Sequence, residues 1–117
     1  MKKNYRGICL IGAGRAGMIH ARYFQRSVPG FRIVSVADPM EEAAASACRE
    51  LEIEKYYLDY KQALEDEETD AVVIVSPTKY HCEIAVCAAK HRKDILLEKP
   101  MAMNARECVQ IMEAVKD

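Results

Sequence analysis

Gly12, Gly14, Gly17 and Asp38 are the residues of this chain whose types and spacing have the clearest chemical meaning. The glycines directly follow the apolar run 7–11, and Asp38 closes the next apolar run. A glycine-rich turn between a strand and a helix brings backbone N–H groups close to phosphate oxygens, and an acid about 20 residues further on can accept hydrogen bonds from ribose hydroxyls. The spacing therefore predicts a dinucleotide-binding unit.

Each glycine is expected to meet a different geometric need. Gly12 allows a sharp turn off the strand, Gly14 lets a pyrophosphate approach the backbone, and Gly17 lets the following helix pack against the strands. The N-terminus of that helix would offer unpaired N–H groups and a partial positive charge to the phosphates. Ala16 is assigned to the same cofactor site. Arg15 could reach the pyrophosphate or extend into solvent, and both alternatives stay open.

Asp38 permits two interpretations. It could cap the helix that Pro39 and Glu41 are expected to open, with Pro39 at the first helical position. It could instead accept hydrogen bonds from the adenosine ribose, and its charge would then repel a 2′-phosphate and favour NAD over NADP. No Lys or Arg directly follows Asp38. We therefore prefer ribose binding, with NAD as the cofactor.

The rest of the sequence indicates the scaffold that must position these residues. Strands are expected at about 6–12, 32–38, 55–57, 71–75 and 94–98, and helices at about 15–27, 39–51, 60–65 and 80–91, with a last one capped by Asn104 and ending near 116. Alternating strands and helices predict an α/β fold with a doubly wound parallel sheet. No strand follows the last helix, so residues 1–117 are interpreted as one dinucleotide-binding domain of a longer enzyme.

Composition narrows the class of protein. A chain of 117 residues, 50% hydrophobic and 30% charged, can form one small globular domain. A formal net charge of −1, with no signal peptide and no long apolar stretch, gives no reason to expect nucleic-acid or membrane partners. Five cysteines without a Cys-x-x-Cys pattern indicate reduced thiols in the cytoplasm rather than disulfides, and no metal site is expected.

Two further polar segments follow the fourth and fifth expected strands. They read Ser-Pro-Thr-Lys-Tyr-His at 76–81 and Glu-Lys-Pro at 98–100. Ligands of open α/β sheets bind beyond the carboxyl ends of the strands. Lys99 and His81 are therefore predicted to face the same crevice as the cofactor. From position alone, Lys99 could equally be a surface lysine and His81 a polar contact at a helix start.

An ordered set of motifs now covers nearly the whole chain. It comprises the glycine turn with His20 behind it, Ala-Asp-Pro at 37–39, Tyr57, Asp59-Tyr60, Ser-Pro-x-x-x-His at 76–81 and Glu-Lys-Pro at 98–100. In this set the chain resembles the N-terminal domain of the glucose–fructose oxidoreductase, inositol dehydrogenase and MocA family. Glu-Lys-Pro is its most specific member.

The resemblance implies an enzyme that uses NAD or NADP to oxidise or reduce a hydroxyl or carbonyl on a sugar, a cyclitol or a related small molecule. It implies that Lys99 is catalytic, by a hydrogen bond from its ammonium to the reacting oxygen. His81 is assigned to the catalytic and cofactor sites, where positioning is its preferred role. Ser76, Pro77, Thr78 and Glu98 are expected to help form the nicotinamide end. The Lys99–Pro100 peptide is expected to be cis.

The chain departs from the family pattern because nothing in it matches the C-terminal α/β domain. That domain would supply most substrate contacts, a second acid or base and any homo-oligomer contact, so the 117 residues alone are not expected to catalyse. Two other functions remain open: a non-catalytic NAD-sensing module, and a methyltransferase-like domain that binds S-adenosylmethionine. The Glu-Lys-Pro motif argues against the sensor, because a sensor needs no catalytic lysine. His20 is interpreted as a packing residue of the first helix.

Overall fold

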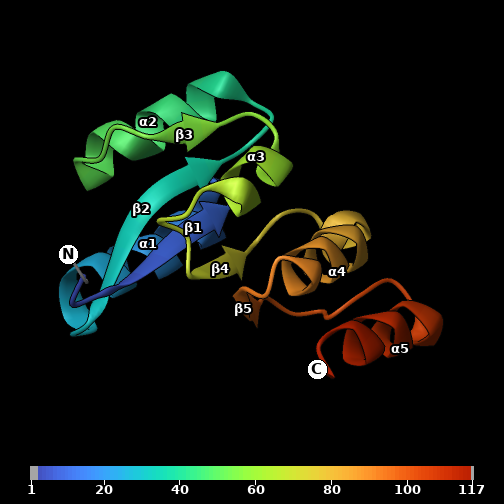
Figure 1. The fold of residues 1–117 in the computed structure, drawn as a ribbon. Coiled ribbons are helices and arrows are strands. Elements are labelled where there is room, and N and C mark those ends of the chain that lie inside the picture. The colour runs from blue at the N-terminus through green and yellow to red at the C-terminus, as the bar shows by residue number, and fades with distance from the viewer. Residues whose placement is uncertain (1–2, 117) are drawn as a thin grey trace.

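The computed structural model describes residues 3–116 and contains a parallel five-stranded sheet with the strand order β3-β2-β1-β4-β5. Figure 1 shows how the helices flank this sheet. In chain order the elements are β1 (Arg6–Ile11), α1 (Arg15–Ser27), β2 (Phe31–Ala37), α2 (Glu41–Leu51), β3 (Tyr56–Tyr57), α3 (Tyr60–Glu65), β4 (Ala71–Ile74), the 3₁₀ turn η1 (Thr78–Tyr80), α4 (His81–Lys90), β5 (Asp94–Leu97) and α5 (Ala105–Ala114).

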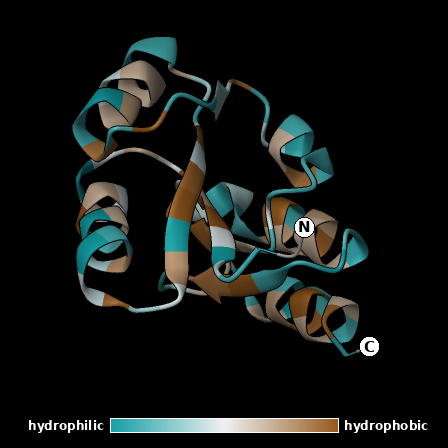
Figure 2. Ribbon diagram, turned by 60° about the vertical axis from the view of Figure 1, so that its left-hand side comes forward, coloured by the Kyte–Doolittle hydropathy of each residue, from teal (hydrophilic) through white to brown (hydrophobic). Residues whose placement is uncertain are grey.

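Two apolar clusters, one on each face of the sheet, confirm the doubly wound arrangement. Residues of α1 and α2 pack with Ile8, Leu10, Ile33 and Val36 on one face. Residues of α3, α4 and α5 pack on the other face, against a second set of strand residues that includes Cys9, Ile11, Val72 and Ile74. Figure 2 shows hydrophobic strands at the centre, with hydrophilic residues on the outer turns of the helices. The central strands are thus covered on both faces, as the apolar run at 71–75 predicted.

One irregularity interrupts the pairing of β1 with β2. Ile8 pairs with Ile33, but Cys9 pairs with Ser35, so Val34 is an extra residue on β2. This is a β-bulge, in which two residues of one strand face one residue of its neighbour. As a result Ile33 and Val36, three residues apart, face the same apolar cluster.

Two helix starts differ in detail from the sequence prediction. Helix α2 begins at Glu41, so the prediction that Pro39 is the first helical residue was wrong. The cause is a local turn in which the backbone N–H of Met40 donates to Oδ1 of Asp38 at 2.8 Å. The expected cap of α5 is confirmed, because Oδ1 of Asn104 accepts from the Glu107 N–H.

The cysteines take no part in the candidate site described below. The structure pairs none of the five in a disulfide, and Cys9 lies fully buried in β1. Burial raises the pKa of the Cys9 thiol to about 12, so it stays protonated and unreactive at neutral pH. Within residues 3–116, no helix combines the length and the apolar character needed to cross a membrane.

Candidate cofactor and catalytic site

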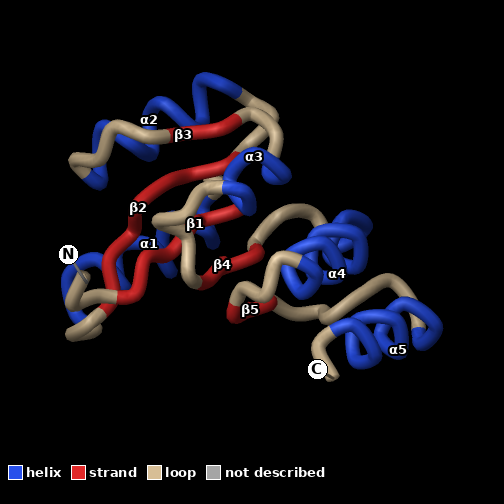
Figure 3. Tube along the Cα trace, viewed as in Figure 1, coloured by secondary structure: helices blue, strands red, loops and turns tan. Residues whose placement is uncertain are grey.

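A pocket of about 850 Å³ opens at the carboxyl edge of the sheet, where β1, β2 and β4 end. Figure 3 shows the connections that leave these strands toward their helices. The glycine turn, Asp38 and the segment Ser76–Pro77 line the pocket. Met40, Leu58 and Ile84 are apolar residues of its walls. The pocket thus combines a polar edge with apolar walls, as binding sites for nucleotide-sized ligands do.

The three glycines of the turn face very different surroundings. Gly12 has a φ of +103°, and a Cβ added to it would lie 2.7 Å from the Ser76 backbone nitrogen. A Cβ on Gly17 would lie 2.0 Å from the Gly12 carbonyl oxygen. A Cβ on Gly14 would meet nothing within 4 Å. Gly12 and Gly17 therefore shape the turn itself, whereas Gly14 leaves open space above its backbone, where a phosphate could approach.

The reason expected for Gly17 needs a correction. Its hydrogen atom leaves room for the backbone oxygen of Gly12, and the nearest strand side chain, that of Leu10, would lie 3.6 Å from an added Cβ. Glycine is therefore required at position 17 mainly because the Gly12 carbonyl oxygen lies so close to the start of α1. Packing of the helix against the strand is a weaker, ordinary contact.

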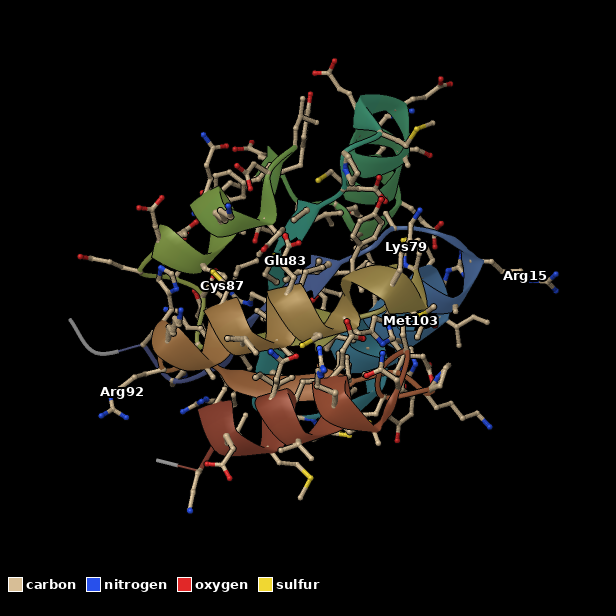
Figure 4. The ribbon with its side chains drawn as sticks, turned by 90° about the vertical axis from the view of Figure 1, so that its right-hand side faces the viewer. Arg15, Lys79, Glu83, Cys87, Arg92 and Met103 are labelled. Carbon is tan, nitrogen blue, oxygen red and sulfur yellow. The ribbon has the colours of Figure 1, made fainter. Side chains whose placement is uncertain are left out.

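The first turn of α1 provides the donors that a phosphate would need. The first helical hydrogen bond runs from the Met18 N–H to the Gly14 carbonyl, which leaves the preceding N–H groups without helical acceptors. No acidic residue lies in this first turn and no side chain caps it. The side chain of Arg15 extends outward from the turn, away from the body of the domain (Figure 4). A phosphate at this position would therefore meet backbone N–H groups and the helix dipole rather than a basic side chain.

Asp38 joins the end of β2 to the glycine turn. Its Oδ2 accepts from the Ala13 N–H at 2.8 Å, while Oδ1 accepts from the Met40 N–H. Each carboxylate oxygen retains a lone pair after these bonds. Asp38 does not cap α2, because the N-cap residue of that helix is Met40 and no side chain caps it, so the capping role was wrong. Asp38 holds the turn instead, and its remaining lone pairs could accept a ribose hydroxyl.

Ser76 contributes a polar atom without a partner. Its Oγ is buried and has no hydrogen-bond partner within residues 3–116, although Ser76 lines the pocket. Buried hydroxyls are normally paired, so an unpaired one at a pocket wall is available to a ligand. The open space over Gly14, the free N–H groups of α1 and this hydroxyl together fit a dinucleotide.

Glu98 and Lys99 follow β5, beyond the residues that line the pocket. The carboxylate of Glu98 lies 2.6 Å from Nε2 of His20 and accepts from the Lys99 N–H at 3.0 Å. These two contacts, the one with His20 first, lower the pKa of Glu98. The Lys99 side chain is exposed and forms no ion pair within the described part of the chain. The Lys99–Pro100 peptide is cis, as expected.

His81 lies in the interior rather than in the pocket. Only 1% of it is exposed. Its Nδ1 lies 3.0 Å from the Pro100 carbonyl oxygen and its Nε2 lies 2.8 Å from the Ser76 carbonyl oxygen. A neutral imidazole can donate to only one of these acceptors at a time. Both ring nitrogens face the backbone, which favours positioning over direct contact with substrate.

The structure brings together most, but not all, of the residues selected from the sequence. The pocket is lined by Gly12, Gly14, Arg15, Ala16, Gly17, Asp38, Ser76 and Pro77, and not by Thr78, His81, Glu98 or Lys99. Sequence reasoning missed the apolar wall and the hydrogen bond from the Tyr60 hydroxyl to Glu83 at 2.7 Å. Apolar residues within three positions of a strand end, such as Met40 and Leu58, were the signal available in the sequence.

The sequence of this chain matches a known protein family. Residues 6–117 match the GFO_IDH_MocA family, described as an oxidoreductase family with an NAD-binding Rossmann fold. The chain belongs to this family. The fold and the family expected from the motifs are thereby confirmed.

Relatives of this chain include several inositol dehydrogenases. The chain is 41% identical over 108 residues to scyllo-inositol 2-dehydrogenase (NAD(+)) of Bacillus subtilis, covering 92% of this chain and 32% of the relative. It is 31% identical over 109 residues to the myo-inositol 2-dehydrogenase of Thermotoga maritima, covering 93% and 32%. The chain thus spans about a third of the length of the curated relatives that it matches.

A solved structure supports the same assignment. The myo-inositol dehydrogenase of Lactobacillus casei, crystallised with NAD(H) and myo-inositol, superposes with a TM-score of 0.90 at 30% identity. The match covers 94% of this chain and 33% of that one. The five-stranded domain of this GFO_IDH_MocA chain therefore corresponds to about a third of that enzyme.

Proposed function

We propose that this chain is the NAD-binding, lysine-bearing part of a dehydrogenase that acts on a cyclitol or a similar polyol. The observation that carries the proposal is the pocket in which the open Gly14, the free N–H groups of α1 and the Asp38 carboxylate converge. The names of the inositol dehydrogenase relatives support the cyclitol as substrate class.

Three parts of the pocket would hold the cofactor. The N–H groups of residues 15–17 would bind the pyrophosphate, assisted by the positive end of the α1 dipole. Asp38 would accept hydrogen bonds from the adenosine ribose and disfavour a 2′-phosphate, so NAD is preferred to NADP. Ser76 and Pro77 would contact the nicotinamide half, with the Ser76 hydroxyl gaining the partner that it lacks.

Lys99 would act on the substrate oxygen. When NAD is bound, its nicotinamide ring accepts or returns the hydride. The Lys99 ammonium would donate a hydrogen bond to the hydroxyl or carbonyl oxygen of the substrate, and the proton of an oxidised hydroxyl would pass to the second acid or base expected from the C-terminal domain. Negative charge developing on that oxygen would then be stabilised by a nearby cation. The exposed, unpaired side chain and the backbone anchored through Glu98 support this role.

His81 would act as a positioning residue, because its ring joins the carbonyl groups of Ser76 and Pro100. Glu98 would do the same through the Lys99 N–H. We place the enzyme in the cytoplasm, because its five cysteines are all unpaired. Thr78 remains a candidate contact at the nicotinamide end.

Binding of cofactors to the full-length protein tests the proposal. NADH fluorescence should report saturable binding, and S-adenosylmethionine should not compete, because it has no pyrophosphate to occupy the α1 N-terminus. Oxidation of myo-inositol and scyllo-inositol, followed as NADH formation, should be detectable. Tight NADH binding without turnover of any polyol would favour the sensing module, and displacement of NADH by S-adenosylmethionine would contradict the proposal.

A further inference from the structure

We infer that His20, on helix α1, is a positioning residue that holds the Lys99 backbone through the Glu98 carboxylate. The inference rests on the proposed function, because it concerns the lysine that acts on the substrate. It assigns a role to a histidine that the sequence presented only as a packing residue. Two hydrogen bonds share the Glu98 carboxylate, one with His20 and one with the Lys99 N–H.

The first bond joins two elements that are far apart in the sequence. Nε2 of His20 lies 2.6 Å from Oε2 of Glu98, across 78 positions of sequence. Both side chains are about one-third exposed, at 34% and 31%, so neither is needed to fill the core. A short polar contact at the edge of the core orients side chains more than it contributes apolar burial.

The charge of Glu98 determines which side chain donates the hydrogen bond. The pKa of Glu98 is lowered, first by His20 and then by the Lys99 N–H, so the carboxylate is ionised at neutral pH. An ionised carboxylate can only accept hydrogen bonds. His20 must therefore donate from Nε2, and a side chain without a donor at that position cannot replace it.

The second hydrogen bond restrains the backbone of Lys99. Oε1 of the same carboxylate accepts from the Lys99 N–H at 3.0 Å, so rotation of the Glu98 side chain would break both bonds together. On the other side of Lys99, the Pro100 carbonyl faces Nδ1 of His81. The Glu98 carboxylate thus holds the lysine backbone, and Nδ1 of His81 lies beside the next carbonyl group, while the Lys99 ammonium remains unpaired in residues 3–116.

His20 lies on the same helix that starts at the glycine turn. Helix α1 starts at the glycine turn, which lines the cofactor pocket, and His20 lies on the second turn of that helix. The same helix would therefore bind the phosphates at its N-terminus, and it contacts the lysine segment through His20. This arrangement ties the position of the catalytic amine to the element that binds the cofactor.

A matched pair of substitutions in the full-length enzyme tests the inference. Methionine and glutamine are similar in length and in helix propensity, but only glutamine can donate from the position of Nε2. We expect His20→Met to lower kcat by about 10- to 100-fold with little change in the Kd for NADH, because a displaced reacting group is costly. His20→Gln should restore most of kcat. His91→Met, at an exposed helix end, is the control and should leave kcat unchanged.

Hydrogen exchange gives a readout that does not depend on turnover. In the cofactor-free protein, the Lys99 N–H should exchange faster in His20→Met than in the wild type or in His20→Gln. Equal kcat values for the two variants, or unchanged exchange at Lys99, would overturn the inference. So would a His20→Met protein that fails to fold while His20→Gln folds, because His20 would then support the fold itself. Lys99→Met separates the two proposals: full activity in that variant would refute the proposed function instead.

Discussion

The two edges of the parallel sheet differ in how their polar groups are satisfied. At the amino edge, protein groups pair with one another: Asp70 contacts Lys3 and the Gly7 N–H, and Asp66 accepts from Lys55 and Tyr57. At the carboxyl edge, the first N–H groups of α1, the Ser76 hydroxyl and the Lys99 ammonium have no partner within residues 3–116.

Groups that stabilise the fold and groups that could bind ligands therefore lie at opposite edges of the sheet. Paired charges at the amino edge stabilise the folded chain, whereas unpaired donors at the carboxyl edge are available to ligands. Exceptions exist at both edges: Oγ1 of Thr69 is buried without a partner at the amino edge, and the carboxylates of Asp38 and Glu98 at the carboxyl edge are paired within the chain. Substitutions at the two edges should therefore have opposite signatures, and four experiments test this expectation.

The largest effect is expected for Lys99→Met in the full-length enzyme. Loss of the only proposed donor to the substrate oxygen should lower kcat by about 100- to 1,000-fold, the range for removal of a group that stabilises an oxyanion. The Kd for NADH and the melting temperature should change little, because the side chain is exposed and unpaired. Steady-state kinetics and NADH fluorescence measure both quantities, and an unchanged kcat would remove Lys99 from the reaction.

A pair of alanine substitutions within the glycine turn tests whether stability and cofactor binding depend on different residues. Gly17→Ala should cost about 3 kcal/mol or more of stability, because its Cβ would lie 2.0 Å from the Gly12 oxygen. Gly14→Ala should leave stability nearly unchanged, since its φ of −76° suits any residue and its Cβ meets nothing. It should weaken NADH binding by about tenfold or more, by occupying the space above the backbone. Urea melts and binding titrations distinguish the two, and equal melts would contradict the geometry.

At the amino edge, Asp66→Asn should lower stability without affecting NADH binding. Burial raises the pKa of Asp66, but hydrogen bonds from Lys55, the Glu68 N–H and Tyr57 outweigh it, and the net pKa is lowered. The loss should be about 1.5–3 kcal/mol at pH 7, the range for a hydrogen bond to a charged group.

The sign of the pH dependence follows from the lowered pKa of Asp66. Its contribution is fully present above the unfolded pKa of about 4 and is lost as the pH falls through the lower folded-state value. Urea melts of the wild type and Asp66→Asn should therefore converge below about pH 4. A difference that persists at acid pH would show that the charge of Asp66 is not the cause.

The smallest effect is expected for Asp38→Asn. The amide can still accept one hydrogen bond but carries no charge, so affinity for NAD should fall by about fivefold, or about 1 kcal/mol. Affinity for NADP should rise relative to NAD, because the repulsion of the 2′-phosphate is removed. Competition titrations with the two cofactors measure the ratio, and an unchanged ratio would assign Asp38 to the turn alone.

Much of this architecture could be predicted from the sequence, because it follows from local patterns. The alternation of apolar runs and amphipathic segments predicted the strands and α-helices of residues 3–116, though not the 3₁₀ turn η1, and the turn at Gly12 to Gly17 predicted the position of the pocket. The start of α2 was misplaced by two residues, since Asp38 uses the Met40 N–H in a turn that propensity does not reveal.

What could not be predicted are contacts between residues far apart in the sequence. The pairing of His20 with Glu98 joins elements at opposite ends of the chain, and no local pattern marks it. The wall formed by Tyr60 and Glu83 likewise depends on how α3 and α4 meet. The burial of His81 between two carbonyl groups is a third case, because the sequence around a histidine at a helix start does not reveal whether it is buried.

The extra residue at Val34 has a practical meaning for anyone who redesigns this domain. Because of the bulge, the residues on its two sides follow different side-chain alternations, so Ile33 and Val36 both face the cluster under α1 and α2. A library that deletes one residue from β2 would therefore turn the residues on one side of the deletion to the opposite face of the sheet. The number of residues in this strand thus constrains redesign as strictly as their identity does.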